Sequence, residues 1–296
     1  MPKNPLAEVF GFPVSAMSEI AVNHRNNRLC PFHNSSGPNC TKASVDNPLG
    51  VCSIYQGNSI VVTCPVRFRQ DFKILSDAGR FFFGDKKFVA LTEVRLNDKA
   101  GKSAGNMDIV LAVLDSNGKV LDFGTIEVQA VYISGNVRKV FDAYISDPNT
   151  NYMMEWPAKN YPKPDYLSSS RKRLAPQLIY KGGILHQWEK KMAVVVHRGF
   201  FEELPDLEIV NQERAEIVWL VYDLNPDDKT GSFNLHLSQA RYTMFDVALE
   251  RIITPDTGDV NIFTRTLETR IKNGKLFGNP PSILVEPTVE PIEYDR

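Results

Sequence analysis

Two acidic residues flank a tight turn in the first half of the chain. Asp108 precedes and Glu127 follows the segment 116–119, Ser-Asn-Gly-Lys, and Asn-Gly favours the turn of a two-residue β-hairpin. In such a hairpin, residues whose numbers sum to 235 pair across the strands, so Asp108 faces Glu127. Gln129 joins the same face because strand side chains alternate.

Two carboxylates that face each other on a sheet repel, unless a cation lies between them. Mg²⁺ prefers oxygen ligands and completes its shell with water and substrate phosphate. The pair therefore indicates a candidate magnesium site. A solvent-facing acidic pair without function, or a bulge that slips the register by one residue, is the alternative interpretation.

A cluster of cysteines near the N-terminus indicates a second metal site. The four cysteines of the chain all lie within its first 64 residues, beside proline, glycine and asparagine, which favour turns: Cys30, Cys40, Cys52 and Cys64. Four thiolates suit tetrahedral zinc or a single iron. The segment has few large apolar residues, so a bound metal would supply folding free energy. Free thiols or two disulfides remain the alternatives.

Hydrophobic periodicity and turn residues predict the elements that carry these side chains. Strands and helices alternate loosely, which predicts an α/β (α+β mixed sheet) fold. We expect strands over residues 88–96, 107–114, 120–132, 192–197, 217–224 and 232–241. We expect helices over 66–83, 137–145, 171–188 (interrupted near Gly182-Gly183), 243–252 and 262–273.

Composition sets broad limits on function. The 296 residues are 43% hydrophobic and 23% charged, as in ordinary globular proteins, and no apolar run is long enough to span a membrane. The N-terminus lacks the pattern of a secretory signal, so we expect a cytoplasmic location. The net charge of -1 gives no support for nucleic-acid binding, although residues 171–191 form a basic stretch.

Three groups of residues resemble the NotI and EagI type II restriction endonucleases. They cover the cysteine segment, the acidic hairpin with the residues after it, and a basic segment, and run from about residue 8 to residue 185. The first contains Cys30-Pro31-Phe32, Cys40, Gly50-Val51-Cys52 and Cys64-Pro65; the second Met107-Asp108, Gly124-Thr125-Ile126-Glu127-Val128-Gln129 and Ile133-Ser134-Gly135-Asn136-Val137-Arg138; the third Lys172-Arg173-Leu174-Ala175-Pro176-Gln177-Leu178-Ile179-Tyr180-Lys181-Gly182. Asp108 and Glu127-Val128-Gln129 look like a PD-(D/E)XK nuclease motif with glutamine at the usual lysine position.

The resemblance implies a Mg²⁺-dependent endonuclease that hydrolyses both strands of a short, GC-rich palindrome and leaves 5′-phosphate and 3′-hydroxyl ends. It implies a homodimer, a companion DNA methyltransferase for the same site, and a structural iron or zinc on the four cysteines. A metal-binding region would span residues 1–66 and a PD-(D/E)XK nuclease domain residues 67–296. By carry-over, Asp108 and Glu127 hold the catalytic metal, Glu93 completes a second metal site, and Gln129 orients the attacking water.

Residues expected to contact DNA lie in two segments. Gly135 and Asn136 precede a predicted helix, where backbone amides and Arg138 can hold a phosphate. Arg173 and Gln177 share a helix face, and these residue types suit guanine and adenine. Phosphate contacts are expected from the neighbouring Arg171 and Lys172. Two hypotheses compete: a metal-stapled DNA-binding protein without activity, and a PD-(D/E)XK nuclease that acts in repair.

Overall fold

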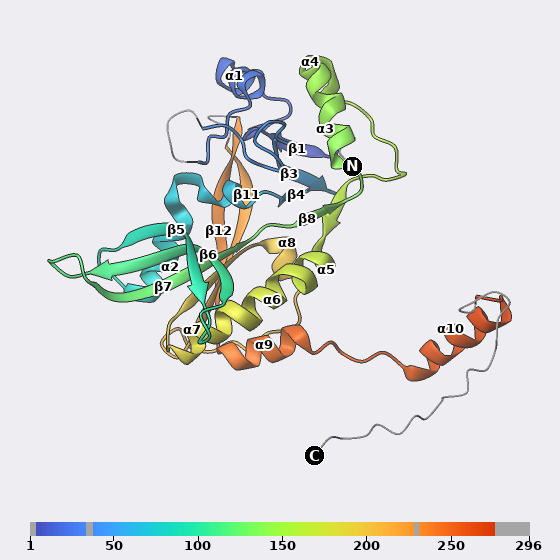
Figure 1. Cartoon of the computed structure of the whole chain (residues 1–296). Helices are drawn as coiled ribbons and strands as arrows, with labels where there is room; N and C mark the ends of the chain where they lie inside the picture. Colours follow the sequence, from blue (N-terminus) through green and yellow to red (C-terminus); the bar gives the residue numbers. More distant parts are fainter. Residues whose placement is uncertain (1–3, 34–37, 228–230, 276–296) are drawn as a thin grey trace. The chain divides into compact units, whose positions relative to one another are not determined.

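A six-stranded mixed sheet forms the centre of the structure, in the strand order β12-β11-β10-β7-β6-β5 (Figure 1). The computed structural model describes residues 4–33, 38–227 and 231–275. β10 runs parallel to β7 and β11, and the other neighbours are antiparallel. The bounds are β5 Val89–Asn97, β6 Ser103–Leu114, β7 Val120–Gln129, β10 Met192–His197, β11 Ile217–Asp227 and β12 Ser232–Thr243. The predicted mixed α/β class is confirmed.

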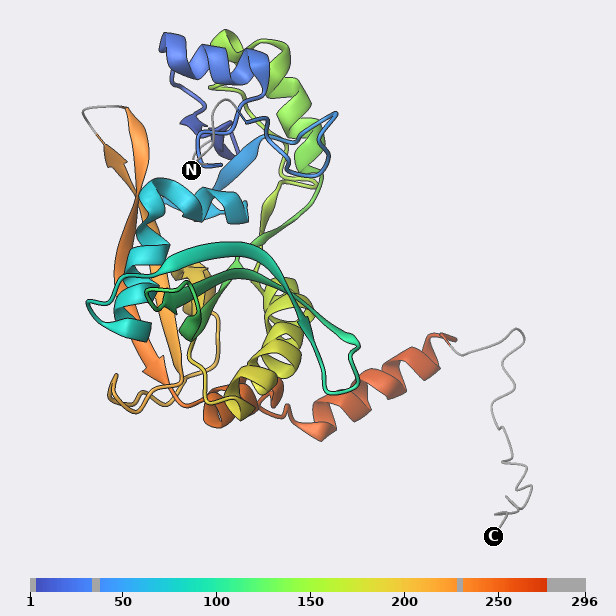
Figure 2. The same cartoon turned by 60° about the vertical axis from the view of Figure 1, so that its left-hand side comes forward.

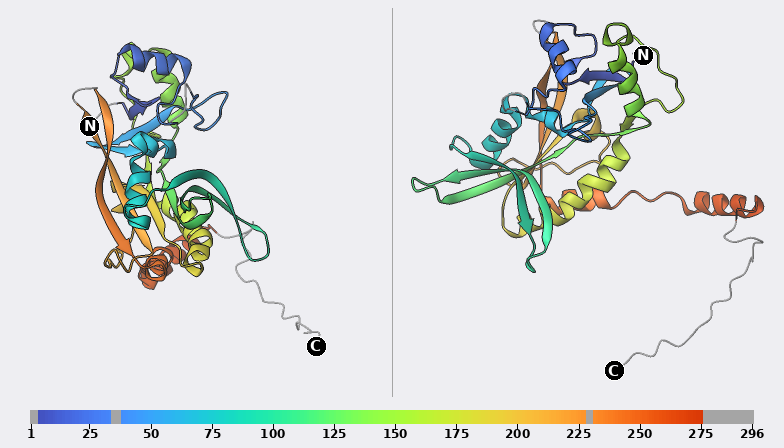
Figure 3. Two further views of the ribbon diagram at one scale, coloured as in Figure 1. Left: turned by 90° about the vertical axis from the view of Figure 1, so that its left-hand side faces the viewer. Right: turned by 45° about the horizontal axis from the view of Figure 1, so that its top comes forward.

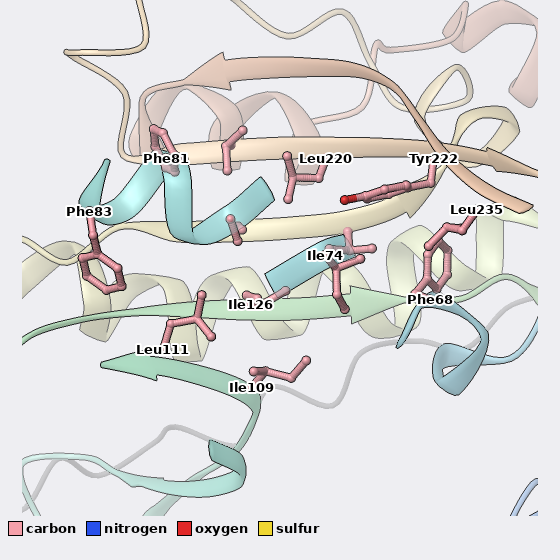
Figure 4. Packing of buried hydrophobic residues seen from close by; sticks show 14 of the residues in the cluster. Phe68, Ile74, Phe81, Phe83, Ile109, Leu111, Ile126, Leu220, Tyr222 and Leu235 are labelled. Atoms are coloured by element: carbon pink, nitrogen blue, oxygen red, sulfur yellow. The ribbon is translucent and has the colours of Figure 1, made fainter. Parts of the chain in front are cut away.

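The central strand β10 is buried along its whole length, because it has a parallel partner on each side. The helix α2 (Lys73–Phe83) packs on one face of the sheet, and Figure 4 shows Ile74 and Phe81 from this helix near Ile126 and Leu220 from the strands. These buried side chains form a continuous apolar core between helix and sheet. The core fixes β6 and β7, the strands that carry the acidic residues, in register.

Within residues 4–254, helices lie on both faces of the sheet and in the N-terminal region. The bounds are α1 Glu19–Asn27, α2 Lys73–Phe83, α3 Val137–Ser146, α4 Pro148–Asn151, α5 Tyr166–Ser169, α6 Ala175–Gln177, α7 Gly183–Gln187, α8 Arg198–Phe201, α9 Phe245–Ile253 and α10 Val260–Lys272. The chain divides into two units, residues 1–254 and 255–296, and α10 belongs to the second. No helix in the described residues is long and apolar enough to cross a membrane.

A small sheet and α3 enclose the N-terminal core, which includes Val51, Ile54, Phe141 and Tyr144. Its strand order is β2-β1-β3-β4, with bounds β1 Leu6–Val9, β2 Phe12–Pro13, β3 Val51–Gln56 and β4 Ser59–Val62. α1, α3 and α4 gather at the same end of the unit (Figure 2). The long hairpin β11–β12 reaches this region from the central sheet, and β11 contacts β4 (Figure 3). A two-stranded ladder, β8 Tyr132–Ser134 with β9 Lys163–Asp165, completes the strands.

The predicted helix over 66–83 is wrong at its start. Residues Pro65–Phe72 form a 3₁₀ helix that ends where Asp71 and Phe72 take positive φ angles, and only then does α2 begin. The change of direction is held from outside the helix, because the Gln70 side chain accepts a hydrogen bond from the Leu235 N–H of β12 (2.8 Å). A tertiary contact thus overrides the helical pattern.

The predicted interruption near Gly182-Gly183 is also wrong. Helical structure runs from Tyr166 to Gln187, with two π-helical turns, Ser170–Leu174 and Leu178–Gly182, on either side of α6. Gly182 serves packing instead, since a Cβ there would lie 2.6 Å from the Phe245 ring.

Candidate active site

The hairpin of β6 and β7 brings Asp108 and Glu127 together in the predicted register. The neighbouring pair joins Ile109 to Ile126, so the next residues along the strands are Asp108 and Glu127. The Asp108 Oδ2 accepts a hydrogen bond from the Val128 N–H (2.8 Å). The two carboxylates therefore lie on adjacent strands, where the charge of Asp108 raises the pKa of Glu127.

The turn that closes this hairpin differs from the predicted two-residue loop. The Gly118 N–H donates to the Asp115 carbonyl (3.1 Å), and Leu114 pairs with Val120, so the loop is one residue longer. A register shift next to Val113 takes up the extra residue. The two departures cancel, and the pairing is as expected from Val113 inward.

Glu127 is buried and only half satisfied. Its side chain has no exposed area, and its Oε2 accepts a hydrogen bond from Lys181 Nζ at 2.7 Å. Its other oxygen, Oε1, is buried without a hydrogen-bond partner among the described residues. Burial, followed by the charge of Asp108, raises the Glu127 pKa from 4.5 to about 7, although Lys181 and the backbone amide of Asp108 oppose the change.

Glu93 extends the acidic row onto a third strand. Thr92 pairs with Ile109 across β5 and β6, so the following residue, Glu93, lies opposite Asp108. Its φ angle of 55° is unusual for a non-glycine residue within a strand. Burial raises the Asp108 pKa, and the charge of Glu93 adds to this. Three carboxylates thus occupy one row across β5, β6 and β7.

A cleft of about 740 Å³ opens beside these carboxylates. It gathers side chains from β5, β6, β7, the helical segment after α5 and the N-terminal region; its lining includes Glu93, Asp108, Gln129, Arg173, Gln177, Cys64, Arg69 and Tyr132. The Gln129 side-chain amide donates to the Ala130 carbonyl (2.7 Å). In the described part of the chain, the buried Gln177 Oε1 finds no hydrogen-bond donor. The Gln177 Oε1, an acceptor without a donor in the described residues, therefore lies in the same cleft lining as Glu93 and Asp108.

The basic helical segment contributes one cation to this cleft. The Arg173 guanidinium lies over the Tyr132 ring, 4.3 Å from its centroid, and its Nε donates to the Tyr132 hydroxyl. Arg171 and Lys172 are exposed and, within the described residues, are absent from the lining. The structure places Arg173 and Gln177 in the lining of the same cleft as Glu93 and Asp108.

Gly135, Asn136 and Arg138, at the start of α3, are not among the described residues that line the cleft. The Asn136 side chain caps α3 by accepting from the Lys139 N–H (3.1 Å). Arg138 donates to the carbonyls of Asn47 (3.0 Å) and Pro48 (3.4 Å) and so ties α3 to the cysteine region. Gly135 is exposed and has a φ of 86°.

The four cysteines form two pairs in the fold, Cys30 with Cys40 and Cys52 with Cys64. An isolated β-bridge lies directly before Cys30 and Cys40, and the β3–β4 hairpin carries Cys52 and leads into Cys64. All four side chains are buried, and none is in a disulfide. Residues distant in sequence are therefore neighbours in the fold.

The thiols also interact electrostatically. Burial raises the Cys30 pKa from 9.0 to about 11, the backbone amides of Phe32 and His33 lower it, and Cys64 and Cys40 raise it. Backbone amides that point at a sulfur stabilise its thiolate form, the form that binds metals.

A lysine lies among the thiols. The Lys42 ammonium donates to the carbonyls of Val51 and Thr63, and the neighbouring thiols counteract the lowering of its pKa by burial. In the residues the structure describes, no three His, Cys, Asp or Glu side chains form a group that could hold a metal ion as they stand. The thiols are buried neighbours rather than a formed tetrahedral site.

Sequence reasoning missed the partners of the acidic and thiol groups. Lys181 lies in the basic stretch and in the third segment that resembles the family, but no role is predicted for it, and Lys42 is not singled out at all. One signal for Lys181 is available in the sequence: it follows Arg173 and Gln177 at four-residue steps, which places all three on one helix face.

Comparison with known families identifies the chain. The family model described as restriction endonuclease NotI matches residues 14–235 of the 296 residues, a span that contains the cysteines, the acidic row and the basic helical segment. The chain belongs to the NotI restriction endonuclease family. It is a type II restriction endonuclease, a site-specific deoxyribonuclease that acts on DNA. No curated protein matches the chain. The NotI family match ends at residue 235, before α9 and α10.

Proposed function

We propose that Asp108 and Glu127 bind the catalytic Mg²⁺ of this restriction endonuclease. The observation that carries the proposal is the buried Oε1 of Glu127, which has no partner among the described residues and lies next to a second carboxylate. Two carboxylate oxygens suit Mg²⁺, which takes one or two protein carboxylates and water. Burial raises the pKa of both residues, and the charge of Asp108 adds to the rise for Glu127; a bound cation would favour the ionised form of both.

The remaining residues of the cleft fit hydrolysis of a phosphodiester. When bound, Mg²⁺ promotes ionisation of a water molecule and stabilises negative charge on the phosphate. Asp108 lines the cleft, where the phosphate would bind, whereas Glu127 is buried and would hold the cation from the side away from the cleft. Gln129 is neutral, so we assign it the orientation of the attacking water. The products are a 5′-phosphate and a 3′-hydroxyl.

We further propose a PD-(D/E)XK core with Glu93 at a second metal position. Support comes from the row of three carboxylates on adjacent strands and from the strained backbone of Glu93. The four buried thiols would hold one structural iron or zinc; support comes from their burial without disulfides and from the electrostatic effect of Cys64 and Cys40 on Cys30. Residues 1–66 would then form the metal-binding region, and residues 67–296 the nuclease domain.

We propose that DNA enters along the face that carries Arg173 and Gln177. Both residues line the cleft, and Gln177 offers an unused acceptor in the described structure. Arg171, Lys172, Gly135 and Asn136 are exposed and available for phosphate contacts, whereas Arg138 is engaged with residues 47 and 48. A short, GC-rich palindrome calls for a two-fold homodimer, and a companion methyltransferase in the cytoplasm would protect the host's copies of the site.

Digestion of mixed plasmid and phage DNA by the purified enzyme tests this proposal. We expect discrete fragments in Mg²⁺ and no cleavage by Asp108→Ala or Glu127→Ala. Glu213→Gln, which removes an exposed carboxylate outside the cleft lining, is the matched control and should cut normally. Normal cleavage by either alanine variant would refute the assignment. A smear of fragments would favour a repair nuclease over a restriction enzyme.

A further inference from the structure

Lys181 makes the closest contact to a catalytic carboxylate. Its Nζ lies 2.7 Å from Glu127 Oε2, and both side chains are buried, with exposed fractions of 8% and 0%. A charge-assisted hydrogen bond of this kind fixes the carboxylate in one orientation. The two oxygens of Glu127 therefore differ: Oε2 accepts a hydrogen bond from Lys181, whereas Oε1 has no partner in the described residues.

The local backbone is shaped to deliver this lysine. Lys181 belongs to the π-helical turn Leu178–Gly182. Such turns are rare in proteins, and those that occur often lie at functional sites. The segment contacts β6, where Gly105 has a φ of 110° and a Cβ would lie 3.2 Å from Lys181 Cε. Figure 1 shows α6 and α7 lying beside β6 and β7. The lysine therefore reaches Glu127 through a gap that a side chain at position 105 would narrow.

Gln129, which stands at the usual lysine position of the nuclease motif, carries no charge. Its amide nitrogen donates to the adjacent Ala130 carbonyl. Lys181 instead supplies a positive charge that interacts with both carboxylates and opposes the rise in the pKa of Asp108 and of Glu127. The positive charge beside Asp108 and Glu127 therefore comes from the helical turn Leu178–Gly182 and not from β7.

We propose that Lys181 is a positioning residue of the nuclease site, which supplies from the neighbouring helix the positive charge that Gln129 lacks and holds one oxygen of Glu127 so that the other faces the cation. This inference rests on the proposed role of Asp108 and Glu127. Gln177 and Arg173, one and two turns earlier on the same helical segment, line the cleft. One helical segment thus serves both the DNA and the catalytic carboxylate.

Replacement of Lys181 should separate cation binding from cleavage. In Lys181→Met both carboxylates remain, but the pKa of Glu127 rises further because Lys181 no longer opposes the effect of burial. At pH 8, Mn²⁺ affinity without DNA should therefore fall by less than about tenfold, because the ion itself favours the ionised carboxylate. Glu127 loses its fixed orientation, so single-turnover cleavage should fall by about 100-fold, as expected for a displacement of about 1 Å at a reacting centre. Lys181→Arg, which keeps the charge and a donor, should retain at least about a tenth of the wild-type rate.

Moving the charge is the sharper test. In the Lys181→Met background, Gln129→Lys should restore cleavage at least about tenfold, because the positive charge returns to the same cleft. A merely structural role for Lys181 would not allow this recovery. Mn²⁺ titration followed by electron paramagnetic resonance and thermal unfolding provide readouts that do not depend on activity, and Lys181→Gln is the alternative should the Met variant fail to fold.

Three results would overturn the inference: cleavage by Lys181→Met within threefold of wild type, loss of Mn²⁺ binding in proportion to the loss of cleavage, or no recovery in the double variant. Asp108→Asn in the same assays distinguishes the two levels of the argument. If Asp108→Asn also cuts DNA, the proposed function fails. If Asp108→Asn is inactive and Lys181→Met is not, only the role of Lys181 fails.

Discussion

Asp108→Asn should abolish cleavage and yet stabilise the protein in the absence of divalent cations. The asparagine keeps the shape of the side chain, and its oxygen can still accept from the Val128 N–H. What it removes is a negative charge beside the buried Glu127 carboxylate. Active sites often carry such strain at the expense of stability, so a loss of function and a gain of stability are expected together.

The magnitude follows from Glu127. A rise of its pKa from 4.5 to about 7 corresponds to about 3 kcal/mol at high pH, and burial is a larger cause than Asp108. Asp108 thus accounts for about 1 kcal/mol, and removal of its own buried charge adds to this. A gain of about 1–2 kcal/mol raises the melting temperature by about 3–6 °C for a domain of this size.

The gain should depend on pH in a defined direction. Folded Glu127 titrates near pH 7 and unfolded Glu127 near 4.5, so the folded protein loses stability as the pH rises between these values. Above pH 7 both carboxylates are ionised and the benefit of Asp108→Asn is largest, whereas near pH 5 it shrinks because Glu127 is protonated. Thermal unfolding at pH 8 and pH 5.5 in cation-depleted buffer measures both.

Asp85→Asn, which changes an exposed acid, should leave the melting temperature within about 1 °C of wild type. Added Ca²⁺ should stabilise the wild type more than Asp108→Asn, because only the wild type has both carboxylates. A lower melting temperature of Asp108→Asn at pH 8, or an equal gain at pH 5.5, would refute the electrostatic argument.

Three further predictions concern the surrounding residues. Arg173→Ala should weaken binding of duplex DNA by about tenfold and reduce the salt dependence by about one phosphate contact, as measured by fluorescence anisotropy in Ca²⁺; Arg171→Ala should have a smaller effect, and equal effects would contradict the assigned entry face. Cys52→Ser should remove the bound iron or zinc and lower the melting temperature by more than about 5 °C, and full metal content by elemental analysis would exclude Cys52 as a ligand. Glu93→Gln should slow single-turnover cleavage by about tenfold with little change in DNA affinity, and an unchanged rate would remove Glu93 from the site.

The sequence predicts the acidic pair well, because register in a hairpin is a local property. Buried residues such as Ile109 and Ile126 must share a face, and this pins Asp108 opposite Glu127. The turn type was not predictable from Asn-Gly alone. The Asp115 carboxylate accepts from the N–H groups of residues 117 and 119 (2.8 and 2.9 Å) and stabilises the longer loop.

Contacts between distant segments were beyond the sequence patterns. Lys181 and Glu127 are 54 residues apart, and their ion pair depends on how the helical segment packs on β6. The break before α2 likewise depends on Gln70 meeting β12. Both features are set by tertiary packing, which local propensity does not encode.

The central claim is that the carboxylates of Asp108 and Glu127 bind the cation that cleaves DNA. A crystal structure of the enzyme with duplex DNA and Mn²⁺ tests it most directly, because anomalous scattering locates the ion. We predict an ion about 2.0–2.3 Å from an Asp108 oxygen and from Glu127 Oε1, next to a phosphate of the DNA. An ion bound elsewhere along the DNA, with Glu127 still held by Lys181 and distant from the metal, would contradict the assignment.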